Sequence, residues 1–260
     1  MKEDIIEINK KTFIKEFEEK NKNKIDTNYL IYWHYTTRKN FTNIVKGEKT
    51  GANYIYFSNL SKANDVLESY AHTINKKIHF LSLSKSKFEI LPMWSMYGGI
   101  DGNGIAIGFT PSKLLKWISS IQVAHPVIDG VVNEDIILRK GVDFEITRGD
   151  ICYIYNSEKN RCFFKCDNTK YLIKNDTIVN DDFYFYKSID WDYEKEYRIV
   201  IKNISKKTYE KVAIKISSNI LKCIKVINGP IVISDDEDWR QYLDIKSSKI
   251  KNSNVYLKKK

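Results

Sequence analysis

Two acidic residues, Glu194 and Glu196, lie one residue apart just before the apolar run that begins at Ile199. In a β-strand, residues two apart point to the same face, so we expect both carboxylates side by side on a strand within residues 191–201. Such a pair suits stabilisation of positive charge and general acid–base work. The alternative is an exposed strand end that carries charges without any chemistry.

A second group of candidate side chains lies on two earlier predicted strands. Residues 29–36 and 53–58 are rich in aromatic and β-branched residues, and a short helix over 41–45 separates them. The first strand carries His34, whose imidazole can hydrogen-bond a hydroxyl group. The alternative for His34 is a core histidine with satisfied hydrogen bonds.

The elements that must position these residues indicate one α+β domain over residues 29–257. Apolar residues at helical spacing predict an amphipathic helix over 4–21, within an N-terminal helical segment 1–28. Residues 258–260 form a basic tail. Further predicted strands cover 77–84, 105–109, 151–155, 171–173, 211–216, 224–230 and 254–257. Further helices cover 114–121 and 235–243, and residues 91–99 form a short helix or a turn.

The glycine-rich stretch around residues 98–108 lacks the spacing of a phosphate-binding loop, so we interpret Gly102, Gly104 and Gly108 as turn residues. The four cysteines form no Cys-x-x-Cys pair, and no histidine lies near Cys162 and Cys166. We therefore expect reduced thiols and no metal ion.

The composition fits a cytoplasmic protein. No apolar run approaches the ~20 residues of a membrane helix, and the N-terminus lacks the pattern of a signal peptide. The net charge of +10 indicates a polyanion such as nucleic acid as partner. The alternative is genome bias, because the positive residues are mostly lysines spread along the chain.

Three segments together resemble a bacterial family known as domain of unknown function 2971. The first is Tyr32–Thr36, followed by Asn64, Asp65 and Glu68; the second is Ser82–Ser84 with residues 93–97 and 104–109; the third comprises Lys187, Trp191, Glu194, Glu196 and Arg198. The segment 226–230 fits as well, so the resemblance covers roughly residues 29–257. Residues 97–99 depart from the family pattern.

The order of His-Tyr-Thr, a middle-strand serine and Glu-x-Glu is similar to ADP-ribosyltransferases, enzymes that use NAD as substrate. This resemblance implies a single domain with two small, mostly antiparallel sheets, peripheral helices and NAD between the sheets. It also implies that the catalytic residues are Glu196 and Glu194. In one assignment Glu196 stabilises the developing charge and Glu194 orients and activates the acceptor; the alternative is that Glu194 is the catalytic acid. The implied NAD-binding residues are His34, Tyr35, Thr36, Tyr54 or Tyr56, and Ser58 or Ser82; the implied substrate-binding residues are Trp94, Tyr97, Trp191 and Arg198.

The implied function is a bacterial toxin or antiphage defence effector that modifies nucleic acid or, second, protein, with an antitoxin or defence-system protein as a further partner. Two alternatives remain. One is another enzyme acting on nucleic acid, such as a nuclease. The other is a non-enzymatic sensor or interaction module, in which Trp191, Glu194, Glu196 and Arg198 form a buried structural network.

Overall fold

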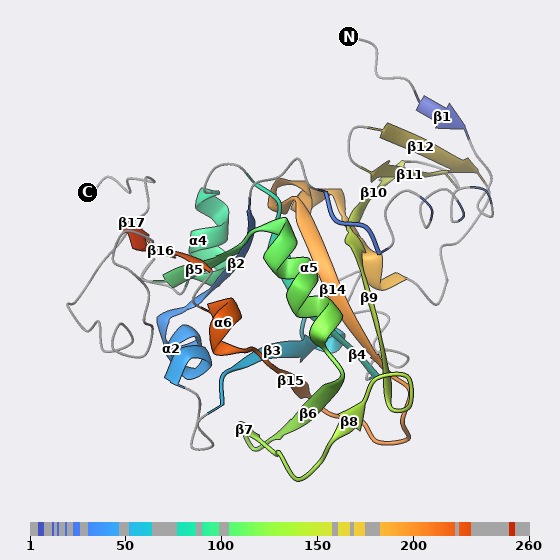
Figure 1. Ribbon diagram of the computed structural model, residues 1–260. Helices are drawn as coiled ribbons and strands as arrows, with labels where there is room; N and C mark the ends of the chain where they lie inside the picture. Colours follow the sequence, from blue (N-terminus) through green and yellow to red (C-terminus); the bar gives the residue numbers. More distant parts are fainter. Residues whose placement is uncertain are drawn as a thin grey trace. The chain divides into compact units, whose positions relative to one another are not determined.

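Helices and strands are mixed along the chain, and most neighbouring strands are antiparallel, as the sequence predicts (Figure 1). The computed structural model describes residues 5–7, 12, 15, 19, 23–26, 31–46, 52–63, 77–86, 90–98, 104–157, 161–166, 169–174, 183–221, 224–229 and 250–252. The predicted residues Asn64, Asp65, Glu68 and Gly102, the helix over 235–243, the strand over 254–257 and the basic tail lie outside these ranges.

Contacts between residues divide the chain into two compact units that are interleaved in the sequence. Unit 1 comprises residues 1–25, 58–82 and 141–210, and unit 2 comprises residues 26–57, 83–140 and 211–260. The division falls within strands β3 (Tyr54–Asn59) and β4 (Ile78–Ser84). Each unit is therefore built from segments that are far apart in the sequence.

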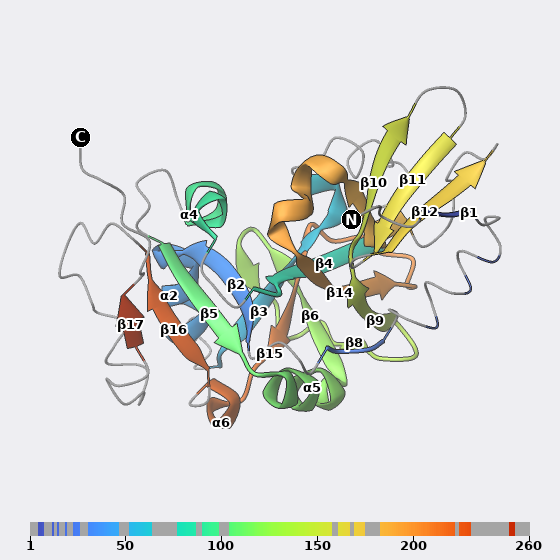
Figure 2. The ribbon, with the colours of Figure 1, turned by 90° about the horizontal axis from the view of Figure 1, so that it is seen from above.

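In unit 2, strand β5 (Gly104–Phe109) lies between β2 (Tyr32–Thr37) and β16 (Lys225–Asn228), antiparallel to both (Figure 2). Strand β17 (Ile250–Asn252) extends this group parallel to β16. The helices α2 (Arg38–Lys46) and α4 (Leu91–Tyr97) both contact β2. The elements β2, β5, β16, α2 and α4 thus match predicted ones with shifts of a few residues at their ends, whereas β17 was not predicted.

The glycines of β5 permit close packing and do not form turns, contrary to the prediction. A Cβ atom on Gly108 would lie 2.6 Å from the Trp33 ring, and one on Gly104 would lie 2.3 Å from the Cα of Gly98. Both glycines are paired with β2, Gly104 opposite Thr37 and Gly108 opposite Trp33. The absence of a side chain is therefore what lets the aromatic ring and the backbone approach β5.

The rest of unit 2 consists of helices and an antiparallel ribbon. Helix α5 (Pro111–Ser120) buries Trp117, whose ring stacks on Phe109 with a centroid distance of 5.7 Å. The remaining elements are β6 (Val123–Ile128), β7 (Val131–Val132), β8 (Leu138–Arg139), β15 (Lys211–Lys215) and α6 (Ser218–Leu221). Strand β6 pairs antiparallel with β7, β8 and β15.

Unit 1 contains a sheet with the order β1-β12-β11-β10-β13. Its strands are β1 (Ile5–Glu7), β10 (Cys152–Ser157), β11 (Arg161–Cys166), β12 (Thr169–Lys174) and β13 (Tyr186–Ser188). Strands β10, β11 and β12 form an antiparallel meander, and β1 and β13 pair parallel to its edges.

Two predictions for this sheet need correction. Residues Ile5–Glu7 form a strand and not the start of a helix, because the β-branched pair finds a partner in β12; Thr12, Lys15 and Glu19 are helical, as predicted. Cys152 is disulfide-bonded, whereas we expected a reduced thiol. Nothing in the cysteine spacing indicates this bond.

The other strands of unit 1 are β9 (Phe144–Asp150) and β14 (Glu196–Asn203), which pair antiparallel, while β14 also pairs with β4. Short 3-10 helices adjoin three strands: η1 (Leu60–Lys62) follows β3, η3 (Phe183–Phe185) precedes β13, and η4 (Ile189–Glu194) precedes β14. In the described parts of the chain, no helix has the length and apolar character needed to cross a membrane.

Candidate functional site

The Glu-x-Glu segment lies where η4 ends and β14 begins, both in unit 1. Glu194 is the last residue of η4, and Glu196 is the first residue of β14. Between them Lys195 adopts a left-handed conformation, with φ 46° and ψ 50°. The prediction that both acids lie on one strand face is therefore wrong, because the chain changes direction at Lys195.

Lys187, on β13, nevertheless brings the two carboxylates together. Its Nζ atom lies 2.5 Å from Oε2 of Glu194 and 3.3 Å from Oε2 of Glu196. It also lies 4.6 Å from the ring centroid of Trp191, close enough for a cation–π contact. The two acids thus share one cation, although they belong to different elements.

Arg198 binds the other side of Glu196 as a fork. Its Nε and Nη2 atoms donate to Oε1 and Oε2 of Glu196 at 2.7 and 3.0 Å, and its Nη1 donates to the Tyr184 carbonyl at 2.7 Å. The guanidinium also lies 4.6 Å from the centroid of the Phe80 ring. Arg198, predicted to bind substrate, has no exposed surface and is committed to these protein groups.

Ser82, on β4, completes the surroundings of Glu196 by donating its hydroxyl to Oε1. Glu196 therefore accepts four hydrogen bonds, two from Arg198 and one each from Lys187 and Ser82. An ionised carboxylate offers about four acceptor positions, so this one is fully used. Of the two serines predicted as alternatives, Ser82 is the one in contact with Glu196; Ser58 lies opposite Phe80 in the β3–β4 pairing.

The backbone of Glu196 is held as firmly as its side chain. Its N–H donates to the Tyr153 hydroxyl at 2.8 Å, and its carbonyl accepts from the N–H of Ile151 at 3.0 Å. Tyr153 is itself buried, and its pKa is raised well above 10, first by burial and then by the charge of Glu196. A neutral tyrosine hydroxyl therefore fixes the point at which β14 begins.

The electrostatics of this cluster hold Glu196 in its ionised form. Burial opposes ionisation, but the charges of Arg198 and Lys187, with hydrogen bonds from Arg198 and Ser82, lower its pKa to about 2. Two cations and two carboxylates balance, as buried charges require. Such a carboxylate can stabilise positive charge but cannot donate a proton near neutral pH.

The predicted residues of the first strand lie in unit 2. The Tyr35 ring packs edge-on against Trp94, with a centroid distance of 4.9 Å, and its hydroxyl accepts from the N–H of Ile90 at 3.4 Å. Thr36 is buried, whereas His34 and Tyr97 are half-buried. The structure thus brings Tyr35 and Trp94 together in the core of unit 2.

The two tyrosines of β3 differ in their surroundings. Tyr54 is 1% exposed and donates its hydroxyl to Glu134. Tyr56 is half-buried and packs on the apolar cluster that contains Tyr54 and Val132. Tyr56 is therefore the more accessible of the two predicted nicotinamide contacts.

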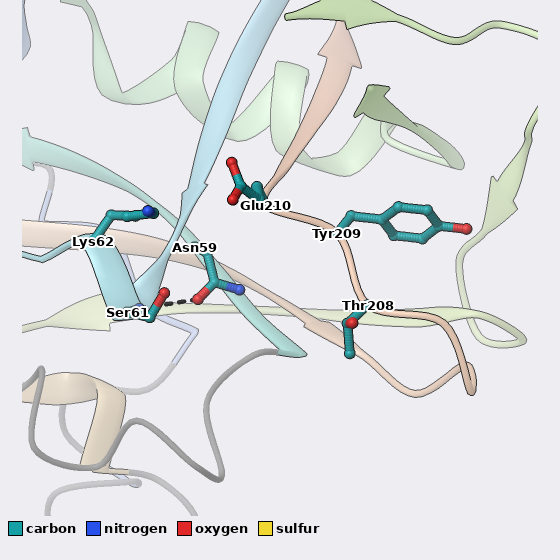
Figure 3. A pocket seen from close by; sticks show the side chains of 6 residues that line it. All are labelled: Asn59, Ser61, Lys62, Thr208, Tyr209 and Glu210. Atoms are coloured by element: carbon teal, nitrogen blue, oxygen red, sulfur yellow. Dashed lines mark hydrogen bonds between the residues drawn. The ribbon is translucent and has the colours of Figure 1, made fainter. Parts of the chain in front are cut away.

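A pocket of about 260 Å³ lies elsewhere in unit 1 (Figure 3), and none of its lining residues is a predicted site residue. They are Asn59, Ser61, Lys62, Thr208, Tyr209 and Glu210. The Asn59 side chain accepts from the backbone N–H of Ser61, and the Tyr209 ring points away from the other side chains. The carbonyl of Tyr209 bonds the buried ring of His79, whose pKa is lowered by burial.

Sequence reasoning gave no chemical role to Lys187 or Tyr153. Lys187 belongs to the recognised signature, but its partners lie on other elements. A lysine in the otherwise apolar run 183–187 is the one signal that could have indicated a buried cation. Tyr153 carries no such signal, because 17 tyrosines occur in the chain.

Residues 93–199 match the sequence model of a family described as "Protein of unknown function (DUF2971)". This is the family that the sequence resembles, and the matched region contains Lys187, Glu194, Glu196 and Arg198. No curated protein and no solved structure matches the chain.

Proposed function

We propose that the chain is an ADP-ribosyltransferase that transfers ADP-ribose from NAD to a macromolecular acceptor and releases nicotinamide. The observation that carries this proposal is the hydrogen bond from Ser82 to Glu196, between the paired strands β4 and β14. It joins two of the three motifs on which the resemblance rests. It also supports Ser82 over Ser58 for the binding of NAD, and Glu196 over Glu194 as the acid that stabilises the developing charge.

In the proposed reaction the bond between nicotinamide and C1′ of the ribose breaks, and its electron pair leaves with nicotinamide. Positive charge develops on the ribose, and the ionised Glu196 stabilises it. Glu194 accepts the proton of the acceptor nucleophile, which then forms the new bond to C1′. The saturated contacts of Glu196 require that one donor give way when the ribose hydroxyls bind.

This proposal assigns His34, Thr36 and Tyr56 to the binding of NAD. It assigns Trp94, Tyr97 and Trp191 to the binding of the acceptor substrate. An imidazole and a hydroxyl can bond the ribose, and a tyrosine ring can stack on nicotinamide. The net charge of +10 makes nucleic acid the first choice of acceptor and protein the second.

A second candidate function is a non-enzymatic interaction module. It is favoured by the four donors around Glu196, which leave the carboxylate fully bonded and the network neutral. In that case the four charged residues stabilise unit 1 and take no part in chemistry.

The test is incubation with NAD labelled in its adenosine part, followed by separation of nucleic acid, protein and small molecules. An ADP-ribosyltransferase labels one of these fractions and releases nicotinamide. We expect Glu196→Gln to abolish both signals, because the amide cannot stabilise the developing positive charge. Glu145→Gln, an exposed acid on the paired strand β9, serves as matched control and should retain full turnover.

Melting of each variant is measured in parallel. If a folded Glu196→Gln variant keeps full turnover, Glu196 has no role in the mechanism. A wild-type protein that neither consumes NAD nor labels any fraction favours the interaction module.

A further inference from the structure

Lys187 is buried, unlike a surface lysine, since only 4% of its side chain is exposed. Its ammonium group faces Glu194 from η4, Glu196 from β14 and the ring of Trp191. An ammonium ion is retained at such a depth only if its charge is compensated. Lys187 and its two acids therefore form one electrostatic unit.

The two cations of the network have different tasks. Arg198 alone engages both carboxylate oxygens of Glu196, so Lys187 is not needed to neutralise that residue. Lys187 is instead the group that contacts both acids, and it lies closer to Glu194 than to Glu196. Its removal would leave Glu196 paired with Arg198 while the link between the acids disappeared.

We propose that Lys187 is a positioning residue that ties Glu194 to Glu196, so that two acids separated by the Lys195 turn act as one pair. This inference rests on the proposed transferase activity for its kinetic consequence, while the coupling itself concerns the folded chain alone. An ammonium group suits the task because its three N–H donors diverge toward two carboxylates and a ring face. A guanidinium, which is planar and larger, does not match that arrangement.

The kinetic test uses Lys187→Ala with NAD as substrate. We expect kcat to fall about 100-fold with little change in KM, as is typical when a catalytic group is misplaced by about 1 Å. Added propylammonium should enter the space left by the side chain and restore part of kcat, whereas 1-propanol, which is neutral and of similar size, should not. Lys195→Ala is the matched control, because Lys195 pairs with Asp192 but is 47% exposed.

Two kinetic outcomes would overturn the proposal. One is an unchanged kcat in Lys187→Ala. The other is equal recovery with propylammonium and propanol, which would mean that the side chain only fills space.

A second measurement does not depend on activity and covers the case in which Lys187→Ala fails to fold. Unfolding by denaturant is compared for Lys187→Met, Glu194→Gln and the double variant. We expect the double variant to be more stable than Lys187→Met, because removal of both charges leaves no uncompensated carboxylate at Glu194. Additive losses, or a double variant no more stable than Lys187→Met, would overturn the coupling.

The two measurements separate the two proposals. A wild-type chain without NAD turnover refutes the transferase, and the unfolding cycle then decides the coupling. A chain with turnover whose Lys187→Ala variant keeps its kcat refutes only the positioning role.

Discussion

At the scale of single residues, the main feature of the buried cluster is that Glu196 accepts as many hydrogen bonds as a carboxylate can. Glu196 receives hydrogen bonds from Ser82, Lys187 and Arg198, and its backbone N–H donates to Tyr153. The Ser82 hydroxyl is the uncharged donor among these side chains. A ribose hydroxyl can therefore take its place without a change in the net charge of the cluster. Ser82 is therefore the contact at which substrate binding and stability compete.

We expect Ser82→Ala to lower the free energy of unfolding by about 1.5–3 kcal/mol, the range for a hydrogen bond to a charged group. Ser58→Ala, on the neighbouring strand β3, is the control and should change it by less than about 0.5 kcal/mol. Unfolding in denaturant measures both. Equal effects of the two substitutions would show that the Ser82 hydroxyl contributes nothing specific to Glu196.

At the scale of elements, the sequence identified most strands but not the break between η4 and β14. The strands β2, β3, β4, β5 and β10 contain runs of β-branched and aromatic residues, which indicate strands by their own composition. The composition of segment 189–194 does not indicate a 3-10 helix. Its first turn is stabilised by a single hydrogen bond, in which the Ser188 hydroxyl accepts from the N–H of Asp190.

The sequence indicates which residues belong to the candidate site but not how they are arranged. Glu194 and Glu196 were identified by type and spacing, and Arg198 by the family resemblance, yet their mutual geometry depends on Lys187 and Ser82, which are brought in by other strands. Spacing along one segment cannot reveal which distant strand supplies a donor. The parallel pairing of β1 was missed for the same reason, since β12 lies far along the chain.

The left-handed Lys195 gives an element-scale prediction. We expect Lys195→Val to lower the free energy of unfolding by about 1–2 kcal/mol relative to Lys195→Gly, because a β-branched residue is strained at positive φ and glycine is not. Both substitutions remove the partly exposed contact with Asp192, which contributes little. Denaturant unfolding of the two variants measures the difference, and equal stabilities would mean that the turn relaxes to another conformation.

At the scale of the whole molecule, the cluster links stability to pH. The pKa of Glu196 is about 2 in the folded protein and 4.5 ordinarily. Its contribution to the free energy of unfolding is therefore complete above pH 4.5 and is lost as the pH falls toward 2. A shift of this size corresponds to roughly 3 kcal/mol.

We expect the wild-type protein to be more stable than Glu196→Gln above pH 4.5 and the difference to shrink as the pH falls toward 2. Carboxyl groups far from the cluster titrate alike in both proteins, so their contributions cancel in the difference. Denaturant unfolding at a series of pH values measures it. A difference that stays constant over this range would mean that Glu196 is not held ionised by its partners.

The pairing of Ile5 with Lys170 has a consequence for synthesis of the protein. Strand β1 is synthesised before its partner β12, which follows only after most of unit 1 has been made, roughly 10 s or longer at ordinary elongation rates. During that time an apolar strand has no native neighbour, and closing so long a loop is slow. The order of translation, and not the strength of any contact, then sets when unit 1 can be completed and how long its first strand is exposed to wrong partners.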